Sequence, residues 1–174
     1  EMVKEIGEVH FQKRLTQICT KMNAPSFSVA VVGEFNRGKS TSINHLLSEA
    51  VLPTGIVPTT EMVTHVLYGN HREIRRIYPD GHSERVEWNP DIWDQFTAKT
   101  DQETCEGILQ ITLPNEWLKK TGIQFIDTPG VNDLSSERAL LALDAIAVCD
   151  ATLVVIDATM ALSLTEKTFI EEHV

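Results

Sequence analysis

Short apolar blocks alternate with turn-forming residues along the chain, and their periods predict strands followed by helices. Residues 26–32 form an apolar run of β-type composition that enters a glycine-containing loop. After this loop, apolar residues recur at the i, i+3, i+4, i+7 spacing of a helix facing a core, at Ile43, Leu46, Leu47 and Ala50. This alternation predicts a three-layer α/β fold with a mostly parallel central sheet.

Downstream segments predict more strands and helices. Residues 72–78 and 82–88 flank Asp80-Gly81, which is a hairpin signal. Residues 108–113 and 123–126 suggest a second antiparallel pair, and 89–106 a surface helix. A further helix over 134–148 would turn three apolar residues toward the sheet, namely Ala139, Leu143 and Ile146.

The first 23 residues predict a helix with two apolar sets on nearly opposite sides. One set comprises Met2, Ile6 and Val9, and the other Phe11, Leu15, Ile18 and Met22. A helix packed on one surface needs a single stripe. The pattern therefore indicates either a kink or frayed start, or a first half that packs against other helices.

Composition sets limits on function. The chain has 174 residues, enough for one sizeable core, and is 42% hydrophobic and 23% charged. Its net charge of −10 argues against nucleic acid as a partner and against broad electrostatic binding to anionic lipid. Three scattered cysteines, no membrane-spanning apolar run and no signal-peptide pattern predict a cytoplasmic protein without disulfides.

The loop after the first strand fits the phosphate-loop pattern G-x-x-x-x-G-K-[ST] at every fixed position. Its residues are Gly33, Glu34, Phe35, Asn36, Arg37, Gly38, Lys39 and Ser40, followed by Thr41. The glycines let backbone N–H groups point at a polyphosphate, and the helix N-terminus adds partial positive charge. Lys39 would reach the outer phosphates and Ser40 would ligate Mg²⁺. A chance match is the alternative, which the strand before and the helix after make less probable.

A second motif, Asp127-Thr128-Pro129-Gly130, follows the strand at 123–126 as D-x-x-G does in GTPases. There Asp127 would hold a Mg²⁺-bound water, and the Gly130 N–H would bond the γ-phosphate. The loop at 52–60 is the place for a first switch. Thr59 and Thr60 compete for the role of the threonine that ligates Mg²⁺ and senses the γ-phosphate.

Together these segments resemble the dynamin superfamily, especially its bacterial dynamin-like members. The resemblance rests on G-E-F-N-R-G-K-S-T at 33–41, L-P-T-G-I-V-P-T-T at 52–60 and D-T-P-G-V at 127–131, with a strand and helix start at 154–166. It implies GTP and GDP as ligands, Mg²⁺, dimerisation through the GTPase domain, and work at membranes as a peripheral protein. It also favours Thr60, five residues after Gly55, as the switch threonine.

The same resemblance sets the domain organisation. Residues 1–23 are predicted as a helix of a helical bundle, and 24–174 as a GTPase domain incomplete at its C-terminus. The guanine-reading [NT]-K-x-D motif is expected beyond the last predicted helix, and the chain stops at Val174, inside that helix. Residues 98–101, Ala-Lys-Thr-Asp, precede the D-x-x-G motif and are in the wrong order for that role. Membrane contact is expected through regions absent from this chain.

The residues for water activation are unusual. Val131 stands where many GTPases carry a water-positioning glutamine. Asn36 resembles the asparagine that holds K⁺ in potassium-stimulated GTPases, or it only stabilises the loop. Arg37 is expected to be solvated, with a contact across a dimer as the alternative. Two other functions stay open, namely a potassium-stimulated GTPase in RNA or ribosome processes and a nucleotide-binding scaffold with low turnover.

Overall fold

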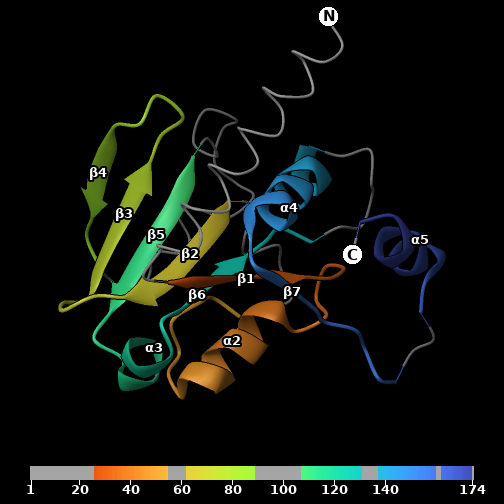
Figure 1. Ribbon diagram of the computed structural model, residues 1–174, viewed down its shortest axis with the longest axis horizontal. Helices are drawn as coiled ribbons and strands as arrows, with labels where there is room; N and C mark the ends of the chain where they lie inside the picture. The colour runs from red at the N-terminus through yellow and green to blue at the C-terminus, as the bar shows by residue number, and fades with distance from the viewer. Residues whose placement is uncertain (1–25, 55–61, 89–106, 131–136, 160–161, 174) are drawn as a thin grey trace, which may run out of the picture.

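A computed structural model describes residues 26–54, 62–88, 107–130, 137–159 and 162–173. Within these ranges the chain forms one mixed sheet (Figure 1). Its strand order is β4 (Ser83–Val86), β3 (Glu73–Ile77), β5 (Ile108–Leu113), β2 (Val63–Tyr68), β6 (Ile123–Asp127), β1 (Phe27–Val32) and β7 (Ala151–Val154). The helices in these ranges are α2 (Lys39–Leu47), α3 (Glu116–Thr121), α4 (Glu137–Val148) and α5 (Leu164–His173). The predicted α/β class is confirmed.

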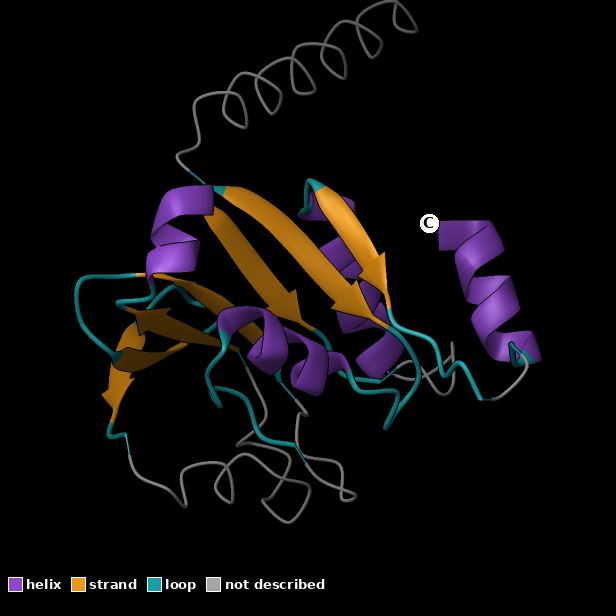
Figure 2. Cartoon of the chain, turned by 90° about the horizontal axis from the view of Figure 1, so that it is seen from below, coloured by secondary structure: helices purple, strands orange, loops and turns teal. Residues whose placement is uncertain are grey.

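Helices cover both faces of the sheet, which gives the three layers. On one face, Ile43 and Leu47 of α2 and Leu118 of α3 pack with buried residues of the central strands. On the other face, Ala142 and Ala145 of α4 join a second apolar cluster that includes Phe169 of α5. Figure 2 shows α5, at the C-terminal end, set beyond the edge strand β7.

The sheet divides into a parallel half and a mixed half. Strand β1 lies between β6 and β7 and is parallel to both. Strand β2 runs antiparallel to β6, and β3 and β4 form the predicted hairpin, with Ile74 opposite Val86. The loops after β1 and β6 therefore leave the same edge of the sheet, which brings their polar residues together.

The predicted antiparallel pairing of 108–113 with 123–126 is wrong. Strand β5 pairs with β2 in parallel and with β3 in antiparallel orientation, and β2 separates β5 from β6. The reason lies in the connection, where Asn115 caps α3 by accepting hydrogen bonds from the N–H groups of Trp117 and Leu118. A capped helix carries the chain past β2, so no hairpin forms.

The prediction of a core-facing apolar stripe on the helix after the phosphate loop is correct for two of its four residues. Ile43 and Leu47 are buried, whereas Leu46 is 47% exposed and Ala50 lies in the exposed segment after the helix. Ser48, in the left-handed region with φ 53°, ends α2 before the stripe is complete.

Several predictions fall outside the described residues. They are the N-terminal helix at 1–23, Thr59 and Thr60, the helix at 89–106 with its Lys99-containing tetrapeptide, and Val131. In the described part of the chain, no helix is long and apolar enough to cross a bilayer.

Candidate nucleotide-binding site

The phosphate loop connects β1 to α2 and has the backbone conformation that its glycines permit. Gly38 is the N-cap residue of α2 and has φ 91°, which L side chains rarely adopt. Asn36 also lies in the left-handed region, with φ 59°, where asparagine is tolerated better than most residues. The loop therefore ends by presenting the N-terminus of α2 to a pocket, as an anion site requires.

Lys39 is the buried cation of this pocket. Its side chain is 8% exposed, and Nζ donates to the carbonyl oxygens of Gly33 and Glu34, both at 3.0 Å. Burial lowers the pKa of Lys39, and the nearby Asp127 carboxylate opposes this shift. The ammonium is thus held inside the loop by acceptors that a phosphate oxygen could replace.

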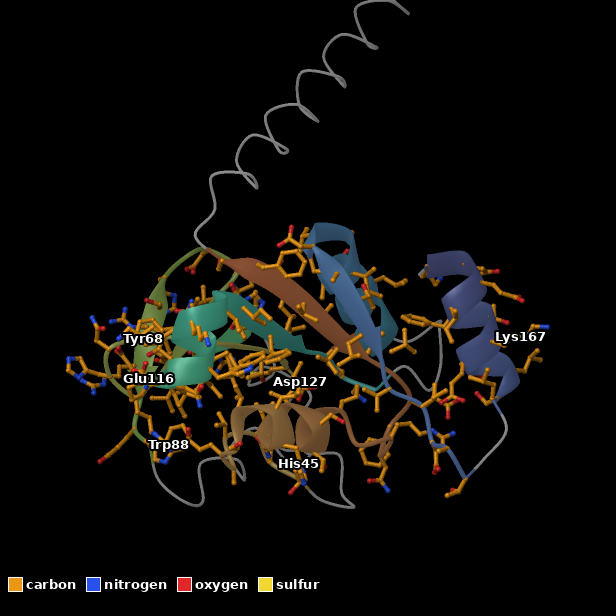
Figure 3. All side chains as sticks on the ribbon, turned by 60° about the horizontal axis from the view of Figure 1, so that its bottom comes forward. His45, Tyr68, Trp88, Glu116, Asp127 and Lys167 are labelled. Carbon is orange, nitrogen blue, oxygen red and sulfur yellow. The ribbon has the colours of Figure 1, made fainter. Side chains whose placement is uncertain are left out.

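Ser40 and Asp127 meet although they lie far apart in the sequence. The Ser40 hydroxyl donates to Asp127 Oδ2 at 2.7 Å, and Asp127 is fully buried on the side of α2 that faces the sheet (Figure 3). Burial raises the pKa of Asp127 to about 6, against the opposing effects of the Ser40 hydrogen bond and the Lys39 charge. Within the described residues, Asp127 Oδ1 has no hydrogen-bond partner.

This donor set fits a magnesium ion. Mg²⁺ prefers oxygen ligands and keeps several of its waters, so a hydroxyl and a carboxylate with one free oxygen suit it. The unpartnered Oδ1 could accept a hydrogen bond from a metal-bound water. Ser40 and Asp127 are therefore the residues that would hold the ion.

The D-x-x-G segment is fixed directly to the phosphate loop. The buried Thr128 donates its Oγ1 hydrogen to the carbonyl oxygen of Val31, at 2.9 Å, at the end of β1. A Cβ at Gly130 would lie 2.7 Å from the Phe35 Cα, so the close approach of the two backbones requires glycine there. The pocket that results is lined by Phe35, Asn36, Gly38, Lys39, Ser40, Thr41, Pro53, Thr54, Thr128 and Gly130.

The expectation that Arg37 is solvated is wrong. Its side chain is 12% exposed and forms ion pairs with Glu34 at 2.6 Å, Glu166 at 3.1 Å and Asp157 at 3.6 Å. The Glu34 carboxylate also accepts a hydrogen bond from Ser163. Arg37 thus contacts the segment after β7 and the first turn of α5, and Glu34 contacts the residue before α5; no local pattern around the loop could reveal these contacts.

Asn44 of α2 is a residue that the sequence analysis missed. Its Oδ1 accepts hydrogen bonds from the N–H groups of Val51 and Leu52, and its Nδ2 donates to the Leu52 carbonyl. These bonds fix the backbone just before Pro53 and Thr54, which line the pocket. The available signal was an asparagine one residue after the core-facing Ile43.

A phosphate loop between a parallel strand and a helix, joined to a D-x-x-G segment on the neighbouring strand, defines the class of phosphate-loop nucleotide-binding proteins. The family model for the dynamin family matches residues 29–174. The chain belongs to this family and forms a GTP-binding domain of the GTPase type.

Relatives and a solved structure agree with this assignment. The chain is 29% identical over 85% of its length to a bacterial dynamin-like protein of Nostoc punctiforme. It is 31% identical over 83% of its length to a probable chloroplastic transmembrane GTPase, FZO-like, of Arabidopsis thaliana. A solved chain of an oligomerised bacterial dynamin pair shares the fold, with a TM-score of 0.66 and 19% identity over 92% of this chain and 32% of that one.

The matched region is a fraction of these relatives. The chain spans 23% of the Nostoc protein and 13% of the Arabidopsis protein.

Proposed function

We propose that this domain binds GTP and GDP with Mg²⁺ and hydrolyses GTP. The observation that carries the proposal is the joint placement of Lys39, Ser40 and Asp127 at the N-terminus of α2, with Asp127 Oδ1 unpartnered among the described residues. Lys39 would exchange its bonds to loop carbonyls for bonds to the β- and γ-phosphates. When bound, Mg²⁺ would neutralise charge that develops on the phosphate oxygens.

Two groups would sense the γ-phosphate, namely the backbone N–H of Gly130 and the side-chain hydroxyl of Thr60. The Gly130 N–H belongs to a segment that contacts Phe35 of the phosphate loop, so a movement of Gly130 would be transmitted to that loop. Thr60 would ligate the metal through its hydroxyl only in the GTP state.

We expect Thr60→Ala to leave GDP binding nearly intact and to reduce turnover strongly, whereas Thr59→Ala should be mild. The reverse ranking in a phosphate-release assay would assign the role to Thr59.

We further propose that turnover is coupled to dimerisation of GTPase domains and to work at membranes. Membership of the dynamin family supports this, as does the fold shared with an oligomerised bacterial dynamin pair. Membrane contact would be made outside this chain, whose net charge of −10 disfavours anionic lipid. The same charge disfavours RNA as a partner.

The test is multiple-turnover phosphate release by the full-length protein with GTP or ATP, in K⁺ or Na⁺ buffer, with and without liposomes. Faster release with GTP, stimulated by liposomes, is the expected result. Tight GTP binding without turnover would support a low-turnover scaffold, as Val131 in place of glutamine would permit. Equal use of ATP would contradict guanine specificity, for which this chain carries no [NT]-K-x-D motif.

A further inference from the structure

Arg37 and Glu34 connect the phosphate loop to the first turn of α5. Arg37 donates through one terminal nitrogen to Glu34 Oε2, at 2.6 Å, and through Nε to Glu166 Oε1, at 3.1 Å. The side chains involved are poorly exposed, at 12% for Arg37, 17% for Glu34 and 5% for Glu166. Ion pairs shielded in this way are weakened less by salt than surface pairs.

Glu166 also belongs to the N-terminal cap of α5. Ser163 and Glu166 form a capping box, in which the Ser163 hydroxyl accepts from the Glu166 N–H and Glu166 Oε2 accepts from the Ser163 N–H, each at 3.0 Å. Ser163 also donates its hydroxyl hydrogen to Glu34 Oε1 at 2.5 Å. Arg37, Glu34, Ser163 and Glu166 therefore close a ring of hydrogen bonds, which we call the loop–helix ring.

The loop–helix ring is connected to the phosphate site through Lys39. The carbonyl oxygen of Glu34 is one of the two acceptors that hold the Lys39 ammonium. A nucleotide that draws Lys39 toward its phosphates would break the bond from Lys39 to the Glu34 carbonyl. The Glu34 side chain is itself a member of the loop–helix ring. Asp157, in the segment that follows β7, contributes a third carboxylate near Arg37, whose positive charge offsets the mutual repulsion of the three.

We propose that Arg37 is a positioning residue that couples occupation of the phosphate loop to the seating of α5 on the domain. The inference rests on the proposed function, since it concerns nucleotide at the same loop. Phe169 packs α5 into the second apolar cluster, and the loop–helix ring orients its first turn. A single coupling free energy then links nucleotide binding at the loop to the position of α5, so each shifts the equilibrium of the other.

The experiment measures amide hydrogen exchange over 164–173 in the full-length protein, with and without Mg²⁺ and GDP. Glu166→Gln is the informative variant, because glutamine keeps the capping box and removes the charge that Arg37 binds. We expect GDP to change exchange in α5 of the native protein by about 5-fold or more, and to leave it nearly unchanged in Glu166→Gln. Exchange in α2 should respond to GDP in both proteins.

Calorimetry with GDP supplies a second readout. Arg37→Gln and Glu166→Gln should each weaken affinity by roughly 5- to 30-fold, and the double variant should be no weaker than either alone. Arg72→Gln is the matched control, since Arg72 pairs with Glu49 and stacks on Trp88 away from the loop. If Arg37→Gln does not fold, Glu166→Gln and its exchange pattern decide the question.

Two results would overturn the inference without contradicting the proposed function. An α5 exchange response that is the same in the native protein and in Glu166→Gln, with GDP bound to both, would remove the coupling and leave the proposed function intact. Additive losses of affinity in the double variant would show that the two residues act separately. A native protein that binds no guanine nucleotide would contradict the proposed function itself, and the coupling with it.

Discussion

Lys39 lies in the most consequential position of the phosphate loop, because it is buried and yet carries a charge. Its ammonium is satisfied by two loop carbonyls, so the folded domain tolerates the burial. We expect Lys39→Ala to weaken GTP and GDP binding by on the order of 100-fold or more, since a charge-assisted bond to each phosphate is lost. Lys119→Ala, an exposed lysine paired with Glu116, is the control. Unchanged affinity for GTP by calorimetry would refute the phosphate-loop assignment.

Asp127 gives the domain a pH dependence with a definite sign. Its pKa in the folded chain is about 6, above the ordinary value of 3.8, because the carboxylate is buried. The neutral form is therefore favoured by folding. The contribution of the neutral Asp127 carboxyl to the free energy of unfolding is fully present below pH 3.8 and is lost as pH rises through 6.

Without nucleotide and Mg²⁺, we expect the unfolding free energy of the native protein to fall relative to Asp127→Asn between pH 4 and pH 7. The change should be roughly 1–3 kcal/mol, as a pKa shift of this size implies. Denaturant titrations of both proteins across this range measure it. A constant difference between the two proteins at all pH values would contradict the buried-carboxylate explanation.

At the scale of elements, Asn44 joins α2 to the segment that precedes the predicted first switch. Its three hydrogen bonds satisfy backbone groups of Val51 and Leu52, both of which are buried. Asn44→Ala would leave those groups without partners, and we expect the free energy of unfolding to fall by about 2–3 kcal/mol. Asn70→Ala, at an exposed site near Tyr68, should change it by less than about 0.5 kcal/mol. Equal effects in a urea titration would show that the Asn44 bonds add no net stability.

At the scale of the whole molecule, we expect a second GTPase domain and a cation to take the place of the water-positioning glutamine, where the sequence has Val131. We expect slow basal hydrolysis that accelerates when two GTPase domains meet, because such contact would order switch one and close a cation site at Asn36. The measurement is turnover per molecule against protein concentration in K⁺ and in Na⁺ buffer. Rates that are flat with concentration and equal in both salts would exclude the dimer and the cation.

Asn36 itself can be tested against its structural alternative. Its φ of 59° suits an asparagine that serves only the loop's shape. Asn36→Gly keeps that backbone conformation and removes the side-chain oxygen. A K⁺ preference that survives in Asn36→Gly would assign the residue to loop shape, and its loss with GTP binding retained would support cation binding.

The sequence alone could predict those features that depend on local residue patterns. The phosphate loop, the D-x-x-G segment, the hairpin around Asp80-Gly81 and the α/β class each depend on residues within a few positions of one another. Backbone angles and short-range hydrogen bonds determine such features, so their signals are contained in short stretches of chain. The dynamin family membership follows from the same stretches.

Only the tertiary structure decided which distant segments meet. The position of β2 between β5 and β6 depends on a capped helix that carries the chain across the sheet. Arg37 and Glu166, 129 residues apart, pair because β7 delivers the start of α5 beside the phosphate loop. Thr128 is likewise fixed to Val31 by the parallel pairing of β1 with β6. Such contacts arise from strand order and burial, which no local spacing of residues encodes.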